Sequence, residues 1–269
     1  MYIAVYNDKG GSCKTTFVRE IALYLERNKK KALVVDLDYK HNITKSFNIE
    51  KKLSVSNILE GISTVEEVLE KTEYLDIVPG SYNLKNCEIN KSIREATFNI
   101  EKDYDYIFFD TANENVVSDM AIYQSDIIIV PVVPEKYSVD NLEYTLTHIE
   151  KLKEHNQKVY VIVMKYDDSE TSRDMLEDIY NICSEKSVNI FRTKIRIDET
   201  VKSVQLRGKE LRSYDFVSDA AEDYKSLTEE FNERMEFYKM ELKKLAEEKA
   251  VEEFKEEISK DNSEENIED

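Results

Sequence analysis

The residues best suited to chemistry lie in a short stretch near the start, NDKGGSCKTTF, from Asn7 to Phe17. Two adjacent glycines precede Lys14, and Thr15 follows it directly. Backbone amides of a glycine-rich loop at a helix N-terminus bind phosphate, a lysine neutralises its charge, and a threonine hydroxyl ligates Mg²⁺. The common pattern G-x-x-x-x-G-K-[ST] is incomplete, because Asp8 and Cys13 occupy the positions of its two glycines. We therefore interpret the stretch as a phosphate loop of another kind.

Aspartates end two apolar runs further along the chain. The run LVVDLDYKHN contains Asp36 and Asp38, and the run YDYIFFD ends in Asp110. A strand-end carboxylate alone is interpreted more simply as a cap for the following turn. At this distance from the loop, however, the capping interpretation is no longer the preferred one.

The elements that must position these side chains follow from the apolar pattern. Short β-branched and aromatic runs alternate with stretches of helical period, which predicts βαβ units around a mainly parallel, twisted sheet with helices on both faces. We expect strands at 2–6, 31–36, 75–79, 104–110, 126–132, 159–164 and 187–191. We expect helices at 14–28, 84–100, 139–155 and 172–184, and one long helix from about 216.

Composition excludes several classes of protein. The three cysteines, Cys13, Cys87 and Cys183, are widely spaced, so they indicate neither a disulfide framework nor a cysteine metal site. The chain begins without a basic segment followed by an apolar run, and no apolar run approaches the roughly 18 residues needed to span a bilayer. We therefore expect a cytoplasmic protein.

The negative charge is concentrated at the C-terminal end. The formal net charge is −18, and the segment from Glu229 onward, with 16 acidic and 7 basic residues, carries half of it. Its apolar residues recur every three or four positions up to Leu245, as in an amphipathic helix. Residues 259–269 have no apolar period, and we expect them to be disordered.

The loop resembles that of a known family. KGGSCKTT matches K-G-G-x-x-K-[ST], the deviant Walker A motif of the ParA/MinD family of ATPases. The resemblance makes Lys9 the signature lysine, which in the family contacts the nucleotide of the facing subunit, so that a homodimer encloses two ATP molecules. Cys13 departs from the commonest form, which has glycine before the second lysine.

The resemblance also implies the role of each site residue. Lys9, Lys14 and Asp38 would be catalytic, with Asp38 orienting the attacking water. Thr15, Asp36 and Asp110 would hold Mg²⁺. The residues expected to bind ATP are Lys9, Gly10, Gly11, Ser12, Cys13, Lys14, Thr15, Thr16 and Pro131. Ala112 and Asn113 stand where the family usually has residues such as Pro-Pro.

The resemblance implies a P-loop NTPase fold over residues 1–231. A C-terminal amphipathic helical extension, 232–258, and an acidic tail, 259–269, would follow. The family's cluster carriers need paired cysteines, which are absent here, and its membrane branch needs a basic C-terminal helix, whereas this one is acidic. The chain therefore is most similar to small, Soj-like ParA partition ATPases of plasmids and chromosomes.

A basic window supports DNA as the partner. It runs from Arg192 to Arg212 and holds seven basic residues against three acidic ones. We expect non-specific DNA contacts from Lys202, Arg207, Lys209 and Arg212. The alternative interpretation is an ordinary solvated surface of mixed charge.

The implied function is slow, Mg²⁺-dependent ATP hydrolysis that controls DNA partition. ATP would drive dimerisation and DNA binding at the nucleoid, and a ParB-like centromere-binding protein would stimulate hydrolysis and release. Two alternatives remain: a positioning or regulatory factor for a non-DNA cargo, and a nucleotide binder that does not hydrolyse ATP.

Overall fold

The computed structural model describes residues 1–50, 52–154, 156–211 and 218–264. The chain divides into two compact units, the first Met1–Thr228 and the second beginning at Glu229. The domain end that the sequence analysis places at 231 stays a prediction. The candidate site lies entirely in the first unit.

A single eight-stranded sheet forms the centre of the first unit within the described residues, in the order β3-β4-β2-β5-β1-β6-β7-β8. All neighbours are parallel except β3 and β4, which are antiparallel. The strands are β1 Tyr2–Val5, β2 Ala32–Leu37, β3 Glu70–Lys71, β4 Asp76–Val78, β5 Tyr106–Thr111, β6 Ile127–Val132, β7 Lys158–Val163 and β8 Asn189–Ile190. The predicted mainly parallel sheet is confirmed, and the two-residue edge strand β3 is an addition to it.

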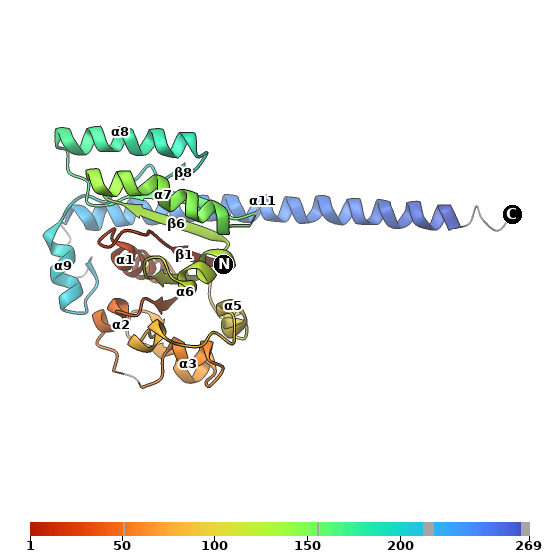
Figure 1. Cartoon of the computed structure of the whole chain (residues 1–269), viewed down its shortest axis with the longest axis horizontal. Coiled ribbons are helices and arrows are strands. Elements are labelled where there is room, and N and C mark those ends of the chain that lie inside the picture. The colour runs from red at the N-terminus through yellow and green to blue at the C-terminus, as the bar shows by residue number, and fades with distance from the viewer. Residues whose placement is uncertain (51, 155, 212–217, 265–269) are drawn as a thin grey trace. The chain divides into compact units, whose positions relative to one another are not determined.

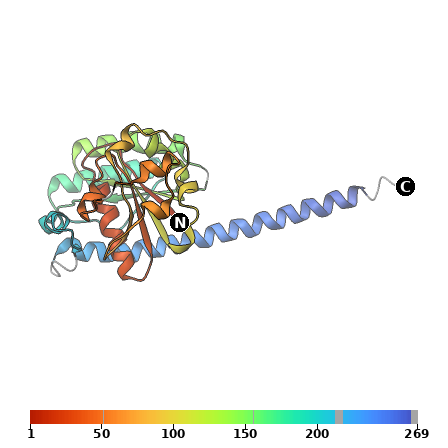
Figure 2. The same cartoon turned by 90° about the horizontal axis from the view of Figure 1, so that it is seen from below.

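Helices cover both faces of this sheet (Figure 1; Figure 2). The helices of the described residues are α1 Lys14–Arg27, α2 Asn42–Ser46, α3 Val55–Leu59, α4 Val65–Val68, α5 Ile93–Thr97, α6 Val116–Gln124, α7 Lys136–Leu152, α8 Glu170–Glu185, α9 Glu199–Leu206 and α11 Asp219–Glu264, with two 3₁₀ turns, η1 Tyr82–Lys85 and η2 Glu101–Asp103. Strands β2, β5 and β6 are buried along their whole length, which explains their continuous apolar sequences.

The strand register brings the functional carboxylates together. Asp110 of β5 is paired with Val5 of β1 on one side and with Asp36 of β2 on the other. Because these strands are parallel, their carboxyl ends meet at one edge of the sheet, where ligands bind in open α/β folds. The loop between β1 and α1 begins at this same edge.

The prediction of one helix over 84–100 is wrong. The segment instead contains η1, the short helix α5 and an irregular connection between them. Ser92 accepts a hydrogen bond from the backbone N–H of Glu95 and so begins α5 anew. Asparagines at 86 and 90 also favour turns over helix interior, and this local preference outweighs the apolar spacing.

The long C-terminal helix is α11, which continues to Glu264. Disorder was expected from 259, so the helical assignment of 259–264 differs from that expectation. Glutamate, lysine and alanine dominate the preceding segment and have high helix propensity, which extends a helix without an apolar face. The expected tail residues 265–269, and the expected helix start at 216, lie outside the described residues.

Candidate nucleotide site

Lys14 is held at the centre of the loop. Its Nζ donates hydrogen bonds to the backbone oxygen of Asn7 at 2.8 Å and to Oδ1 of Asn113 at 3.1 Å. The side chain is buried, and burial lowers the pKa of Lys14, while the charges of Asp110 and Asp38 act to raise it. The loop therefore holds a buried cation that triphosphate oxygens would neutralise.

Asp110 lies behind the loop at the end of β5. Its Oδ2 accepts a hydrogen bond of 2.8 Å from the hydroxyl of Thr15, the second residue of α1. Burial, together with the charge of Asp36, raises the pKa of Asp110 well above its usual range. A divalent cation beside Thr15 and Asp110 would offset this cost of burying a carboxylate.

Asp36 is fully buried and has internal partners. Its Oδ2 accepts from the backbone N–H and the hydroxyl of Thr44, at 3.0 and 2.6 Å. Its Oδ1 accepts from the backbone N–H of Asp38. Burial raises the pKa of Asp36 to about 6, although the hydrogen bonds from Thr44 lower it. Its role toward Mg²⁺ stays a prediction, because the carboxylate serves first to anchor Thr44.

A cavity of about 460 Å³ opens above the loop. Its floor comes from Gly10 to Thr16, and Asp38 and Asn42 line one side. Asp38 is 9% exposed, and its Oδ1 accepts from the backbone N–H of Lys40 at 2.9 Å, which fixes the carboxylate at the cavity edge. The structure therefore brings the loop and the predicted water-orienting residue into one site.

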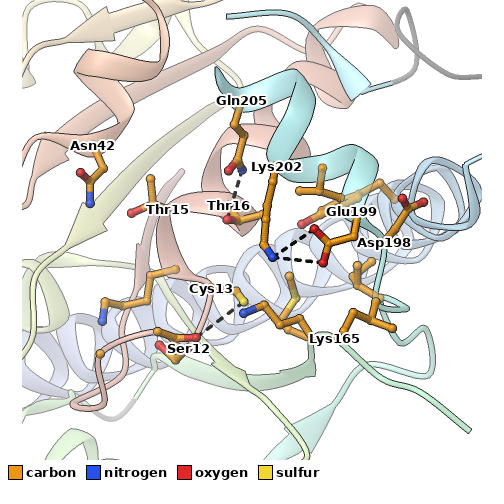
Figure 3. A pocket seen from close by; sticks show the side chains of 18 of the residues that line it. Ser12, Cys13, Thr15, Thr16, Asn42, Lys165, Asp198, Glu199, Lys202 and Gln205 are labelled. Carbon is orange, nitrogen blue, oxygen red and sulfur yellow. Dashed lines mark hydrogen bonds and ion pairs between the residues drawn. The ribbon is translucent and has the colours of Figure 1, made fainter. Parts of the chain in front are cut away.

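The opposite wall of the cavity includes residues that the sequence did not predict (Figure 3). Lys165 follows β7, and Gln205 of α9 donates a hydrogen bond of 3.1 Å to the hydroxyl of Thr16. Lys165 could have been found from its place after a parallel strand, whereas Gln205 meets Thr16 only through tertiary packing. The remaining lining residues include Met164, Ile195, Arg196, Ile197, Asp198, Glu199, Val201 and Tyr224.

Two predicted ATP contacts do not line this cavity. Pro131 lies within β6, where its carbonyl oxygen accepts from Nδ2 of Asn7 at 2.8 Å. Lys9 instead lies beside the cavity, with its Nζ 3.8 Å from Oε2 of Glu135. The sequence motif located the strand correctly, but Pro131 lies within that strand and not in the loop that follows it.

Cys13 adopts a left-handed backbone conformation, with φ 70° and ψ 23°. This region favours glycine, because a Cβ there crowds the backbone. The family's preference for glycine at this position thus has a structural reason, and this chain carries the strain. Burial raises the pKa of the Cys13 thiol, while the neighbouring Lys165 lowers it.

Two side chains of the basic window, Lys202 and Arg196, have acidic partners within the chain. Lys202 lies on the cavity wall, and its Nζ is 3.1 Å from Oε1 of Glu199. Arg196 forms charged hydrogen bonds to Asp223 and Asp219, at 2.9 and 2.8 Å. Of the expected DNA contacts, only Arg207 and Lys209 are exposed away from the cavity lining. Arg212 lies outside the described residues.

The residues present fit a magnesium nucleotide. Two buried oxygens, Ser12 Oγ and Asp110 Oδ1, have no hydrogen-bond partner among the described residues. A phosphate oxygen would accept from the Ser12 hydroxyl, and a Mg²⁺ shell would use the Asp110 carboxylate together with Thr15. A buried lysine, a glycine pair and the amino end of α1 complete the phosphate-binding set.

A phosphate loop between β1 and α1, at the carboxyl edge of a mainly parallel sheet, defines a P-loop nucleotide-binding protein. A family described as an AAA domain matches residues 1–161. Together with the relatives below, this match shows that the chain belongs to the ParA/MinD family of ATPases.

Relatives and solved structures agree with this assignment. The sporulation initiation inhibitor protein Soj of Bacillus subtilis is 26% identical over 247 residues, covering 85% of this chain and 96% of Soj. A putative plasmid partition protein of Borrelia burgdorferi B31, solved with AMPPNP, has a TM-score of 0.74 at 22% identity, covering 87% of this chain and 98% of that chain. The septum site-determining protein MinD of Pyrococcus horikoshii OT3, solved with Mg-ADP, has a TM-score of 0.73 at 19% identity, covering 88% and 98%.

These comparisons support a partition-type ATPase that binds a nucleotide with Mg²⁺. Across the described part of the chain, each helix is too short or too polar to cross a membrane.

Proposed function

We propose that the chain is a DNA partition ATPase, in which ATP binding drives a sandwich dimer that binds DNA non-specifically. The observation that supports it most is the convergence of Lys14, Thr15, Asp38 and Asp110 on one loop and cavity. Hydrolysis would be slow, stimulated by a ParB-like centromere-binding protein, and would release the DNA. The protein would accordingly work in the cytoplasm, at the nucleoid.

Each residue of the site has a task in this proposal. Mg²⁺, when bound with ATP, neutralises charge on the phosphates. Lys14 and the loop amides bind and position the phosphates, and the Thr15 hydroxyl with Asp110 would hold the metal. Asp38 would orient the attacking water from the cavity edge. Positioning and charge neutralisation suffice, because phosphoryl transfer needs little covalent chemistry from the protein.

Dimerisation would bring Lys9 to the nucleotide of the partner subunit. In the single chain Lys9 is only 29% exposed at its side chain and lies near Glu135. Such a partly exposed ion pair is worth at most about 1 kcal/mol, so it would not prevent Lys9 from moving to a triphosphate.

The first experiment measures ATP hydrolysis and DNA co-sedimentation together, with ATP or ADP, for the wild type, Lys14→Ala and Asp38→Ala. We expect DNA binding to require ATP, to survive Asp38→Ala and to fail with Lys14→Ala. ATP binding without DNA binding at low salt would refute the partition proposal and leave the fold assignment intact.

A second experiment tests the DNA surface. Neutralising Arg207 and Lys209 together should weaken salt-sensitive DNA binding while ATP binding persists, because these two side chains are exposed. The matched control neutralises Lys102 and Lys151, two exposed lysines on other elements. Equal loss of DNA binding in both double variants would show a general charge effect and reject the assigned surface.

A second candidate function is an ATP-dependent positioning or regulatory factor for a non-DNA cargo. It is favoured by two exposed apolar side chains on α11, Phe237 and Met240, which are 63% and 68% exposed. Hydrolysis that DNA leaves unchanged would favour this candidate. Intact ATP binding without hydrolysis would instead favour a non-hydrolysing relative, a possibility raised by Asp8 and Cys13.

A further inference from the structure

Asn113 stands between two cavities at the edge of the sheet. It follows β5, and its side chain lines both the cavity above the phosphate loop and a second cavity of about 620 Å³. Asp38 and Lys40 also line both, so the two cavities meet at these three residues. Asn113 is therefore the residue through which the segment after β5 reaches the phosphate loop.

The side-chain oxygen of Asn113 accepts from the central lysine. Lys14 Nζ has three acceptors: Asn7 O at 2.8 Å, Asn113 Oδ1 at 3.1 Å and Lys9 O at 3.5 Å. An ammonium group has three hydrogens to donate, so all of them are in use. Two of the acceptors are backbone carbonyls of the loop itself, and Asn113 supplies the side-chain acceptor. A phosphate that binds Lys14 would compete with these acceptors, of which Asn113 is the one carried on a side chain that can rotate.

The amide nitrogen of Asn113 faces the same loop. Nδ2 lies 3.7 Å from the point where a Cβ on Gly10 would stand, while the hydrogen bond from Lys14 uses Oδ1 of the same amide. Asn113 thus presents an N–H donor to the cavity, and Gly10, which has no side chain, leaves the space in front of it open. This donor is the complement that a phosphate oxygen needs.

The backbone at Asn113 is fixed while its side chain is exposed. The Asn113 carbonyl oxygen accepts from Nδ2 of Asn115 at 2.9 Å and from the hydroxyl of Ser118 at 3.2 Å. Asn115 also begins α6 by accepting from the backbone N–H of Ser118. A change at Asn113 therefore occurs by rotation of its terminal amide, which is a broad and low-barrier torsion, without movement of the chain.

We propose that Asn113 distinguishes ATP from ADP by rotating its carboxamide. With ADP, or without nucleotide, Oδ1 accepts from Lys14; with ATP, Lys14 turns to the γ-phosphate and Nδ2 donates to the same phosphate. A carboxamide suits this exchange because it carries an acceptor and a donor on one rotating group. Aspartate keeps the acceptor but adds a negative charge, and alanine has neither group. This proposal rests on ATP binding at the loop.

The test compares the affinities for ADP and for a non-hydrolysable ATP analogue, both with Mg²⁺, in the full chain by calorimetry. For Asn113→Ala we expect about tenfold weaker binding of the ATP analogue, because a hydrogen bond to a charged group is lost, and ADP binding within about twofold of wild type. Asn113→Asp should lose more affinity for the ATP analogue than Asn113→Ala does, through repulsion of the γ-phosphate.

Asn115→Ala is the matched control, since it removes a neighbouring asparagine that contacts α6 and the Asn113 backbone but not the loop. We expect its ratio of the two affinities to equal that of the wild type. An unchanged ratio in Asn113→Ala, or an equal change in Asn115→Ala, would overturn the proposal. If the wild type binds neither nucleotide, or Lys14→Ala binds both as well as wild type does, the proposed function itself fails.

Discussion

Replacing Cys13 by glycine should stabilise the protein. Cys13 occupies the left-handed region at φ 70°, which costs a residue with a Cβ about 1–2 kcal/mol. Glycine removes that cost but makes the unfolded chain more flexible, which offsets about 0.4–1 kcal/mol. The thiol contributes little in return, because its hydrogen bond to Gly11 O is long, at 3.8 Å, and its other polar neighbour is the side chain of Lys165. We expect a net gain of about 1 kcal/mol in the free energy of unfolding.

The assay is thermal unfolding of the nucleotide-free protein, followed by circular dichroism. A gain of about 1 kcal/mol corresponds to a rise in Tm of about 2–4 °C for a domain of this size. Cys13→Ala is the control, since it removes the thiol but retains the Cβ and therefore the strain. If Cys13→Gly unfolds at or below the temperature of Cys13→Ala, the left-handed conformation of Cys13 does not destabilise the folded protein, and the reasoning is refuted.

Three further predictions concern the interior. Gly80→Ala should lower the free energy of unfolding in urea by about 1–3 kcal/mol, because its Cβ would lie 2.7 Å from the backbone oxygen of Asp36. Gly10→Ala is the control, since the atom nearest to its Cβ would be 3.7 Å away. An equal loss of stability in Gly10→Ala would contradict this reasoning. Glu20→Ala should cost about 3–5 kcal/mol, because it leaves its fully buried ion-pair partner Arg19 without a carboxylate, and a loss below about 1 kcal/mol in the same assay would reject this. The pKa of Asp36 is raised from the ordinary 3.8 to about 6 in the folded protein. Protonation of Asp36 therefore contributes stability that is fully present below about pH 4 and is lost as the pH rises through 6. A pH series of unfolding free energies should therefore show the nucleotide-free wild type falling relative to Asp36→Asn between pH 4 and 7, and a constant difference would count against the shift.

The central part of the fold was predictable because its signals are local. Continuous apolar runs identified β2, β5 and β6, and the strand, loop and helix around Lys14 required no tertiary information. The edge strand β3 has only two residues, and its pairing with β4 depends on contact rather than on pattern. The segment 84–100 was mistaken for a helix because apolar spacing was weighed above its turn-forming asparagines.

The candidate site was predictable on the side of the loop and much less so on the opposite wall. Lys14, Thr15 and Asp38 follow motifs within short stretches of sequence, and the structure brings them together. The position of Lys202 depends on how α9 packs on the loop, and the partners of Arg196 lie 23 and 27 residues away. A count of basic residues cannot reveal which of them have acidic partners in the fold.

The anchoring of α11 has a mechanical consequence. Its first turns are held to the ATPase unit by the ion pairs of Arg196 with Asp219 and Asp223, and by a hydrogen bond of 2.9 Å from the Tyr24 hydroxyl to Ala221 O. Arg196 lines the nucleotide cavity, and Tyr24 belongs to the helix that begins at Lys14. The first turns of α11 are therefore tied both to a wall of the nucleotide cavity and to the helix that follows the phosphate loop, so a shift of these turns would displace both.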